Sequence, residues 1–280
     1  MTAETTPEAI TPTPEPVIEA REIVKSFGIV RSLNGVTVKG YAGKVTCILG
    51  DNGAGKSTLI KTLAGFHAPD SGGLYVDGQP VRFSSPHEAR DAGIAVVYQD
   101  LAMQPLMPVW RNFFLGHELK KGIGPVKLLD VKRSREICNA ELARMGIDIR
   151  DVNQPVGTLS GGERQSAATA RAVYFGARVL ILDEPTSALG VRQSGIVLRN
   201  IQLARQNGHA VFFITHSPAH ALLVGDSFTL LSRGRVIGQH QAGKITEEQL
   251  IHEMAGGQDL DRLREDLGVA TPSLSDSRET

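Results

Sequence analysis

The segment Gly50–Ser57, GDNGAGKS, restricts the possible folds of this chain more than any other. It matches the pattern G-x-x-x-x-G-K-[ST], follows the apolar run KVTCILG and precedes a helix predicted from Ser57 to Gly65. In such a strand–loop–helix unit the backbone N–H groups turn towards phosphate oxygens, and the helix N-terminus adds partial positive charge. A purely structural glycine-rich turn is the alternative, but it does not account for the lysine and the serine. The segment therefore predicts a nucleotide-phosphate site.

The residues of this loop have distinct expected roles. Lys56 is expected to reach the β- and γ-phosphates, Ser57 to ligate Mg²⁺ and Thr58 to bind the α-phosphate. The other loop positions expected to surround the phosphates are Gly50, Asn52, Gly53, Ala54 and Gly55.

A second predicted strand, in ARVLILDEP, ends in two carboxylates. Ligands of open α/β sheets bind at the carboxyl ends of the strands, so the strand would deliver both acids to the nucleotide. Asp183 is expected to bind Mg²⁺, directly or through water, and Glu184 is expected to act as the general base for an attacking water. Many strands end in acids, and it is the phosphate loop upstream that favours this interpretation.

Three further residues are candidates whose ordinary structural explanations remain open at this point. Gln99 is expected to end the strand GIAVVYQ, where its amide would contact Mg²⁺ and the attacking water. His216 follows the apolar run of HAVFFITHS and would hydrogen-bond the γ-phosphate, although a single histidine is often structural. Phe27 would stack on a purine, and a core aromatic is the alternative.

Buried apolar strands alternate with helical segments along most of the chain, which predicts an α/β fold with a mainly parallel sheet. We expect a P-loop NTPase core with an N-terminal antiparallel β part and an inserted helical subdomain at about residues 100–176, where strand patterns are absent. A hairpin is predicted to turn near Arg233–Gly234. The domain is expected to span 17–256, between a disordered tail at 1–16 and a second tail at 257–280.

Composition and charge give no support for several classes of protein, although a local basic patch is compatible with an even overall balance. Thirty basic residues balance thirty acidic ones, which removes the usual electrostatic argument for nucleic-acid binding. The two cysteines, Cys47 and Cys138, lack metal-site spacing and are expected to be buried reduced thiols. No apolar run approaches the roughly 20 residues needed to span a bilayer, and no secretory signal is visible.

The segment LSGGERQSAATARA, residues 159–172, predicts a second anion-binding helix N-terminus. One ATP is already surrounded by the phosphate loop, the Mg²⁺ acid, the base and the γ-phosphate sensor. We therefore expect Ser160, Gly161 and Gly162 to clamp the γ-phosphate bound to a second copy of the chain. Two copies would bury two ATP molecules head to tail.

In their order along the chain, GDNGAGKS, YQD, LSGGERQ, ILDEPTSALG and THS resemble the motifs of the ATP-binding cassette (ABC) ATPases. The resemblance runs from about Val17 to about Gly257, and no Asn-Lys-x-Asp motif of guanine-reading proteins is present. It implies that Phe27 stacks on adenine, that Gln99 senses Mg²⁺ and contacts a membrane partner, and that His216 is the switch histidine. It also implies ATP hydrolysis in a sandwich dimer that drives a transmembrane permease.

The segments SALGVRQS and VVYQDLAMQPLMPVWRNFFLGHEL resemble the monosaccharide-import branch of this family. Gly190 stands where the family commonly has an aspartate that helps couple the two sites. Many members of the branch fuse two cassettes; this sequence shows one and so resembles the single-cassette variants, which implies that two copies would be needed. The resemblance also implies a groove around Leu101–Trp110 that receives a short permease helix; packing within the helical subdomain is the alternative. A basic set would face lipid headgroups or form an ordinary solvated surface: Lys120, Lys121, Lys127, Lys132 and Arg133.

These features together predict the ATPase subunit of a monosaccharide importer at the cytoplasmic face of the membrane, with ATP and Mg²⁺ as cofactors. Its partners would be permease subunits and, indirectly, an extracytoplasmic sugar-binding protein. Import of another solute, such as branched-chain amino acids, is the first alternative. A soluble ABC protein acting on DNA or ribosomes is the second, but it usually has paired cassettes or long coiled coils. A non-hydrolysing regulatory cassette is the third, and the full set of catalytic residues argues against it.

Overall fold

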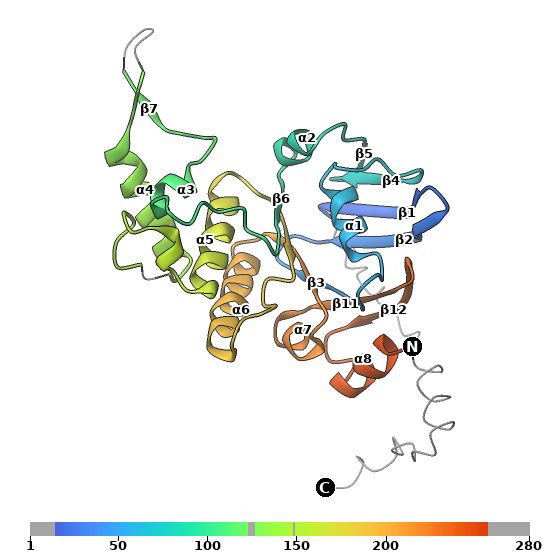
Figure 1. Ribbon diagram of the computed structural model, residues 1–280. Coiled ribbons are helices and arrows are strands. Elements are labelled where there is room, and N and C mark those ends of the chain that lie inside the picture. The colour runs from blue at the N-terminus through green and yellow to red at the C-terminus, as the bar shows by residue number, and fades with distance from the viewer. Residues whose placement is uncertain (1–14, 123–126, 148, 257–280) are drawn as a thin grey trace, which may run out of the picture.

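The computed structural model describes residues 15–122, 127–147 and 149–256, which form two main sheets and a helical lobe that carries a third, two-stranded sheet (Figure 1). The two predicted tails lie outside the described residues, except for residues 15 and 16. In the part of the chain that is described, no helix is both long enough and apolar enough to cross a membrane.

The larger sheet has six strands in the order β12-β11-β3-β10-β9-β6. Its parallel strands are β3 (Val45–Leu49), β6 (Ile94–Val97), β9 (Val179–Asp183), β10 (Ala210–Thr215) and β11 (Ser227–Ser232), and β12 (Arg235–Gln241) is antiparallel at one edge. Along β9 the side chains alternate between two cores, with Ile181 in one and Leu182 in the other. Because both faces of the sheet are covered, β3, β6, β9 and β10 are mainly apolar runs, as the sequence predicted.

The smaller sheet is antiparallel, in the order β2-β1-β4-β5. It consists of β1 (Ile18–Phe27), β2 (Val30–Gly40), β4 (Ser71–Val76) and β5 (Gln79–Val81). It shares one hydrophobic core with α1 (Lys56–Leu63) and one face of the larger sheet. Gly40 lies where the sheets approach closely, since an added Cβ would be 3.0 Å from the Phe212 ring. The predicted α/β class with an N-terminal antiparallel part is confirmed.

Helices cover the opposite face of the six-stranded sheet. They are α6 (Val191–Gln206), α7 (Pro218–Val224) and α8 (Glu247–Met254), while the short α2 (Pro86–Asp91) precedes β6. The hairpin β11–β12 turns at Arg233–Gly234, both with positive φ, as predicted. Cys47 and Cys138 are free and buried, also as predicted.

Between β6 and β9 the chain forms a lobe with its own hydrophobic core. It contains α3 (Val109–Phe113), α4 (Val131–Arg144), the 3₁₀ turn η1 (Val156–Thr158) and α5 (Gly161–Tyr174). The expected lack of strands is wrong at one hairpin, β7 (Lys120–Lys121) with β8 (Leu128–Leu129), which extends from the lobe in Figure 1. Two-residue arms are too short to give a periodic pattern. The basic residues at 120, 121 and 127 are exposed.

Candidate functional site

Four neighbouring strands of the larger sheet end at one edge, because β3, β10, β9 and β6 are parallel. Gly50 follows β3, His216 follows β10, and Asp183 is the last residue of β9. Gln99 reaches the same edge, but β6 ends at Val97, so the prediction that Gln99 ends the strand is wrong by two residues. The chain leaves the sheet earlier, and Gln99 lies in the following loop.

The backbone of the phosphate loop has positive φ at three glycines, and at two of them an added Cβ would also collide with backbone. Gly50 has φ 153°, and an added Cβ would lie 2.3 Å from the Leu231 carbonyl oxygen. Gly55 has φ 105°, and its Cβ would lie 2.8 Å from the Ser32 carbonyl oxygen. Gly53, with φ 83°, has no atom within 4 Å of that position, so its surroundings are open to a ligand. Ala54 is buried in the core, and this anchors the loop.

A cavity of about 240 Å³ lies against this loop and collects most of the predicted site residues. Those residues are Asn52, Gly53, Gly55, Lys56, Ser57, Thr58, Gln99, Asp183 and Glu184. Two other residues line the cavity: Asp51, which lies within the predicted phosphate loop although no role was assigned to it, and Ser32, which the sequence did not indicate. The Ser32 hydroxyl lies 2.7 Å from the Thr58 hydroxyl, which ties the β1–β2 hairpin to α1.

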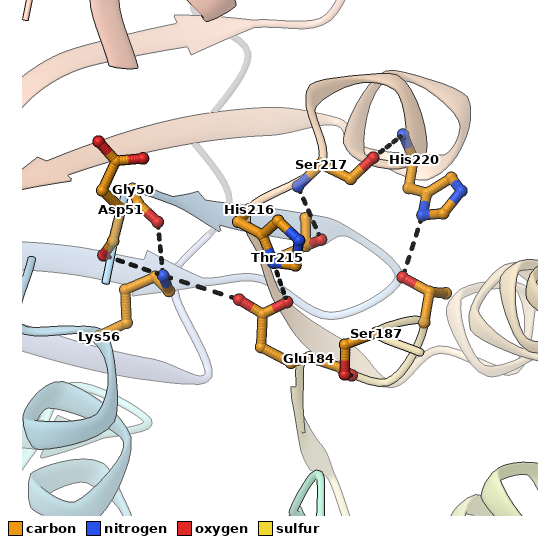
Figure 2. Close-up of polar contacts among 10 residues, drawn as sticks. Gly50, Asp51, Lys56, Glu184, Ser187, Thr215, His216, Ser217 and His220 are labelled. Atoms are coloured by element: carbon orange, nitrogen blue, oxygen red, sulfur yellow. Dashed lines mark hydrogen bonds and ion pairs between the residues drawn. The ribbon is translucent and has the colours of Figure 1, made fainter. Parts of the chain in front are cut away.

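Lys56 lies at the N-terminus of α1, and its side chain is only 8% exposed. Its ammonium donates hydrogen bonds to the carbonyl oxygens of Gly50 and Asp51, the latter at 3.2 Å. The Glu184 carboxylate lies 3.7 Å from the same nitrogen (Figure 2). The cation is thus held at the cavity, next to the candidate base.

Glu184 occupies a left-handed backbone conformation, with φ 48°, which is costly for a residue with a side chain. The Glu184 N–H donates to the Ile214 carbonyl oxygen at 3.0 Å, and the Ser187 N–H donates to the Glu184 carbonyl oxygen at 3.1 Å. Its carboxylate is 2.8 Å from His216 Nδ1, as Figure 2 shows. These bonds hold the side chain between Lys56 and His216.

Burial raises the pKa of the Asp183 carboxyl above its ordinary value, and the Glu184 charge raises it further, while Lys56 opposes both. A bound cation would favour the ionised form. Asp183, Ser57 and Gln99 all offer oxygen ligands, the donor type that Mg²⁺ prefers. No group of three or more His, Cys, Asp or Glu suited to a metal occurs among the described residues. The three oxygen donors that line the cavity fit a cation that also takes ligands from phosphates and water.

Phe27 does not line the cavity and lies at the end of β1, where it is 46% exposed. Its ring meets the His67 ring edge to face, with centroids 5.1 Å apart. It shares the β1–β2 hairpin with Ser32, which does line the cavity. The exposed ring on this hairpin is open to stacking by a flat ligand.

Ser160, Gly161 and Gly162 lie outside the cavity that contains Lys56. Ser160 caps α5, and its hydroxyl accepts from the Glu163 N–H at 3.3 Å. In return, the Glu163 carboxylate accepts from the Ser160 N–H at 2.7 Å, which completes a capping box. Gly161 lines a neighbouring cavity of about 350 Å³ together with Gln99 and Glu184. The described chain therefore has two cavities that share the candidate base.

One pair near the base was not indicated by the sequence patterns. His220, in the first turn of α7, places Nδ1 3.0 Å from the hydroxyl of Thr186. A second histidine four residues after His216 was the available signal.

Comparison with known proteins places these motifs in one family. The family model described as "ABC transporter" matches residues 33–187. The xylose/arabinose import ATP-binding protein XylG of Sulfolobus acidocaldarius is 41% identical over 85% of this chain and 93% of its own length. The fructose import ATP-binding protein FrcA of Rhizobium meliloti is 42% identical over 79% of this chain and 86% of its own.

Solved structures of the same fold include a nucleotide-free ATP-binding cassette from an ABC transporter. It is 23% identical, with a TM-score of 0.74 over 88% of this chain and 98% of that one. A dimeric cassette bound to ADP and Pi is 21% identical, with a TM-score of 0.67 over 81% of this chain and all of that one.

Proposed function

Because this chain belongs to the ABC transporter family, whose cassettes are ATPases, we propose that it energises the import of a monosaccharide through a membrane permease. The observation that carries the catalytic part is the contact series from Lys56 through Glu184 to His216 at the phosphate-loop cavity. The solute class rests on the xylose/arabinose and fructose import relatives.

In the proposed reaction Glu184 accepts a proton from water as the water oxygen bonds to the γ-phosphorus. The bond from that phosphorus to the β–γ bridging oxygen breaks, and its electron pair stays on ADP. Lys56 and the N–H groups of the phosphate loop stabilise the charge that develops on the phosphate oxygens. Asp183, Ser57 and Gln99 would hold Mg²⁺, which neutralises phosphate charge when bound. His216 orients the water and the γ-phosphate.

The proposed active unit is a dimer in which Ser160, Gly161 and Gly162 of one copy complete the ATP site of the other. The first N–H groups of a helix have no intrahelical acceptor and suit an anion. In this chain those of α5 lie outside its own nucleotide cavity, which supports their use by a second copy. The exposed Phe27 ring is the proposed adenine platform.

The proposed location is the cytoplasmic face of the membrane, bound to permease subunits that work with an extracytoplasmic sugar-binding protein. A groove of about 360 Å³ between β6 and α5 supports a docked permease helix, and its lining includes Tyr98, Leu101, Met103 and Phe175. We propose that the ATPase domain spans 17–256, with the helical subdomain at about 100–176. The even charge balance gives no support for a nucleic-acid partner.

The test of the catalytic assignment is Glu184→Gln. We expect the rate of ATP hydrolysis to fall by about a hundredfold or more, the usual scale for a general base, while Mg-ATP produces a stable dimer in light scattering. The matched control is Glu253→Gln, since Glu253 also pairs with a histidine at 2.8 Å, His240, outside the nucleotide cavity. A monomer at saturating Mg-ATP contradicts the dimer, and near-normal hydrolysis contradicts the role of Glu184.

The test of the transport role is gentle co-purification from the membranes of the source organism. A multi-span permease with a sugar-binding protein supports the importer and narrows the solute. A permease with a binding protein for amino acids would redirect the solute class. Ribosomes, DNA or no membrane partner would refute the transport role and leave the ATPase chemistry intact.

A further inference from the structure

We propose that His220 is a positioning residue for ATP hydrolysis, and that it acts through Thr186 on the loop that begins with the general base. The inference rests on the proposed role of Glu184. It concerns a contact on the side of the loop facing α7, away from Lys56. We refer to residues 184–189 as the base loop.

The contact itself is well defined. His220 Nδ1 lies 3.0 Å from the Thr186 hydroxyl, and Thr186 is only 5% exposed. Thr186 is two residues beyond Glu184, inside the turn closed by the bond from the Ser187 N–H to the Glu184 carbonyl at 3.1 Å. A displacement of Thr186 is therefore transmitted to Glu184 through a short closed turn.

The two histidines near the base loop come from one corner of the fold, where β10 leads into α7 (Figure 2). Ser217 caps α7 and accepts from the His220 N–H at 3.4 Å, which fixes the backbone of His220. His216 bonds the Glu184 carboxylate, and His220 bonds Thr186. The corner thus holds the base loop at two points.

The base loop needs such anchors, because two of its non-glycine residues have positive φ, Glu184 at 48° and Ala188 at 58°. A non-glycine residue keeps this left-handed conformation only where surrounding contacts hold it. The His216 side chain is 60% exposed and is proposed to turn to the γ-phosphate. When it does so it releases Glu184, and the bond from His220 to Thr186 remains to tie the loop to α7.

The chemistry of the contact suggests matched variants. Either the Thr186 hydroxyl donates a hydrogen bond to Nδ1 or the Nδ1–H donates to the hydroxyl oxygen, so the bond exists in either neutral tautomer. An asparagine amide can place a donor or an acceptor near the position of Nδ1, whereas leucine offers neither. Valine keeps the shape of Thr186 but loses the hydroxyl, and serine retains the hydroxyl.

The experiment compares the steady-state ATPase kinetics of His220→Leu and Thr186→Val with those of the unmodified full chain. Each change is expected to lower kcat by about fivefold, the scale of one hydrogen bond, with KM for ATP within about twofold and the thermal midpoint retained. His220→Asn and Thr186→Ser are expected to keep at least about half of kcat. The double variant should be no slower than either single one, because both remove the same bond.

The matched control is His240→Leu, which removes a half-buried histidine bond to Glu253 and should leave kcat unchanged. Full kcat in both His220→Leu and Thr186→Val overturns the inference. So does a His220→Asn protein as slow as His220→Leu, or a double variant whose losses multiply. Normal hydrolysis by Glu184→Gln would instead refute the proposed base, so the two failures are distinguishable.

Discussion

Replacement of Gly161 by alanine is expected to affect ATP hydrolysis at the proposed second-copy site while leaving the stability of the fold almost unchanged. The added Cβ would lie 2.5 Å from Leu189 Cδ2 and 3.5 Å from Gln193 Oε1, both near the ends of mobile side chains. Moving Leu189 away from its preferred rotamer costs about 0.5–1.5 kcal/mol. Alanine in place of glycine stabilises a helix by up to about 1 kcal/mol. The two effects nearly cancel.

The expected outcome for Gly161→Ala is therefore a thermal midpoint within about 4 °C of the unmodified protein. Hydrolysis should nevertheless fall by about tenfold or more, because the methyl group obstructs an N–H group proposed to meet the γ-phosphate of the second copy. ATP affinity of the monomer should be unchanged, since Gly161 does not line the nucleotide cavity. Differential scanning fluorimetry, a fluorescent ATP analogue and phosphate release measure the three quantities.

The matched variant is Gly162→Ala, whose Cβ would lie 3.0 Å from the backbone oxygen of Gln193. Backbone cannot rotate away, so α6 must shift, and overpacking of this kind costs about 1–3 kcal/mol. Its thermal midpoint should fall below that of Gly161→Ala. Full ATPase activity in Gly161→Ala would refute the proposed second-copy site, and a lower midpoint than in Gly162→Ala would refute the packing argument.

Three other changes have clear expected outcomes. Lys56→Ala should abolish ATP binding in calorimetry, and retained affinity would contradict the phosphate-loop assignment. Asp183→Asn should raise the thermal midpoint of the nucleotide-free protein at neutral pH. The pKa of Asp183 is raised in the folded protein, so ionisation of its carboxyl destabilises the fold as pH rises above 3.8. The advantage of the asparagine variant over the unmodified protein should therefore vanish below that pH. Gly190→Asp should raise the thermal midpoint by about 1 °C. Gly190 is the N-cap of α6 and has open space around it, and aspartate stabilises an N-cap by a few tenths of a kcal/mol more than glycine. A lower midpoint would contradict this expectation.

Much of the site could be predicted because each motif is local and the topology is constrained. GDNGAGKS, LDE and THS each follow an apolar run, and parallel strands must deliver their carboxyl ends to one edge. The exact end of β6 could not be predicted in the same way. Tyr98 continues the apolar pattern, yet it lies beyond the last ladder residue, Val97. Apolar periodicity reports burial, and burial extends past the strand.

Contacts between distant segments were beyond sequence reasoning. Ser32 faces the phosphate loop because the smaller sheet packs across the larger one, and no local pattern around Ser32 indicates that packing. The contact between Thr186 and His220 depends on the left-handed turn at Glu184, a conformation that a glutamate does not indicate. Side-chain pairs of this kind follow from loop geometry, which local propensity does not determine.

The base loop contacts both predicted phosphate-binding segments, the phosphate loop and the N-terminus of α5, which are far apart in the sequence. Its first residue, Glu184, lines both cavities, and its last, Leu189, packs against Gly161. In the proposed dimer, the loop that carries the base for one ATP therefore also supports the helix end that clamps the other. A shift of the loop would alter both sites of one copy together. Gly161→Ala displaces Leu189 in addition to obstructing the N–H group, so both effects are expected to slow hydrolysis while nucleotide binding stays intact.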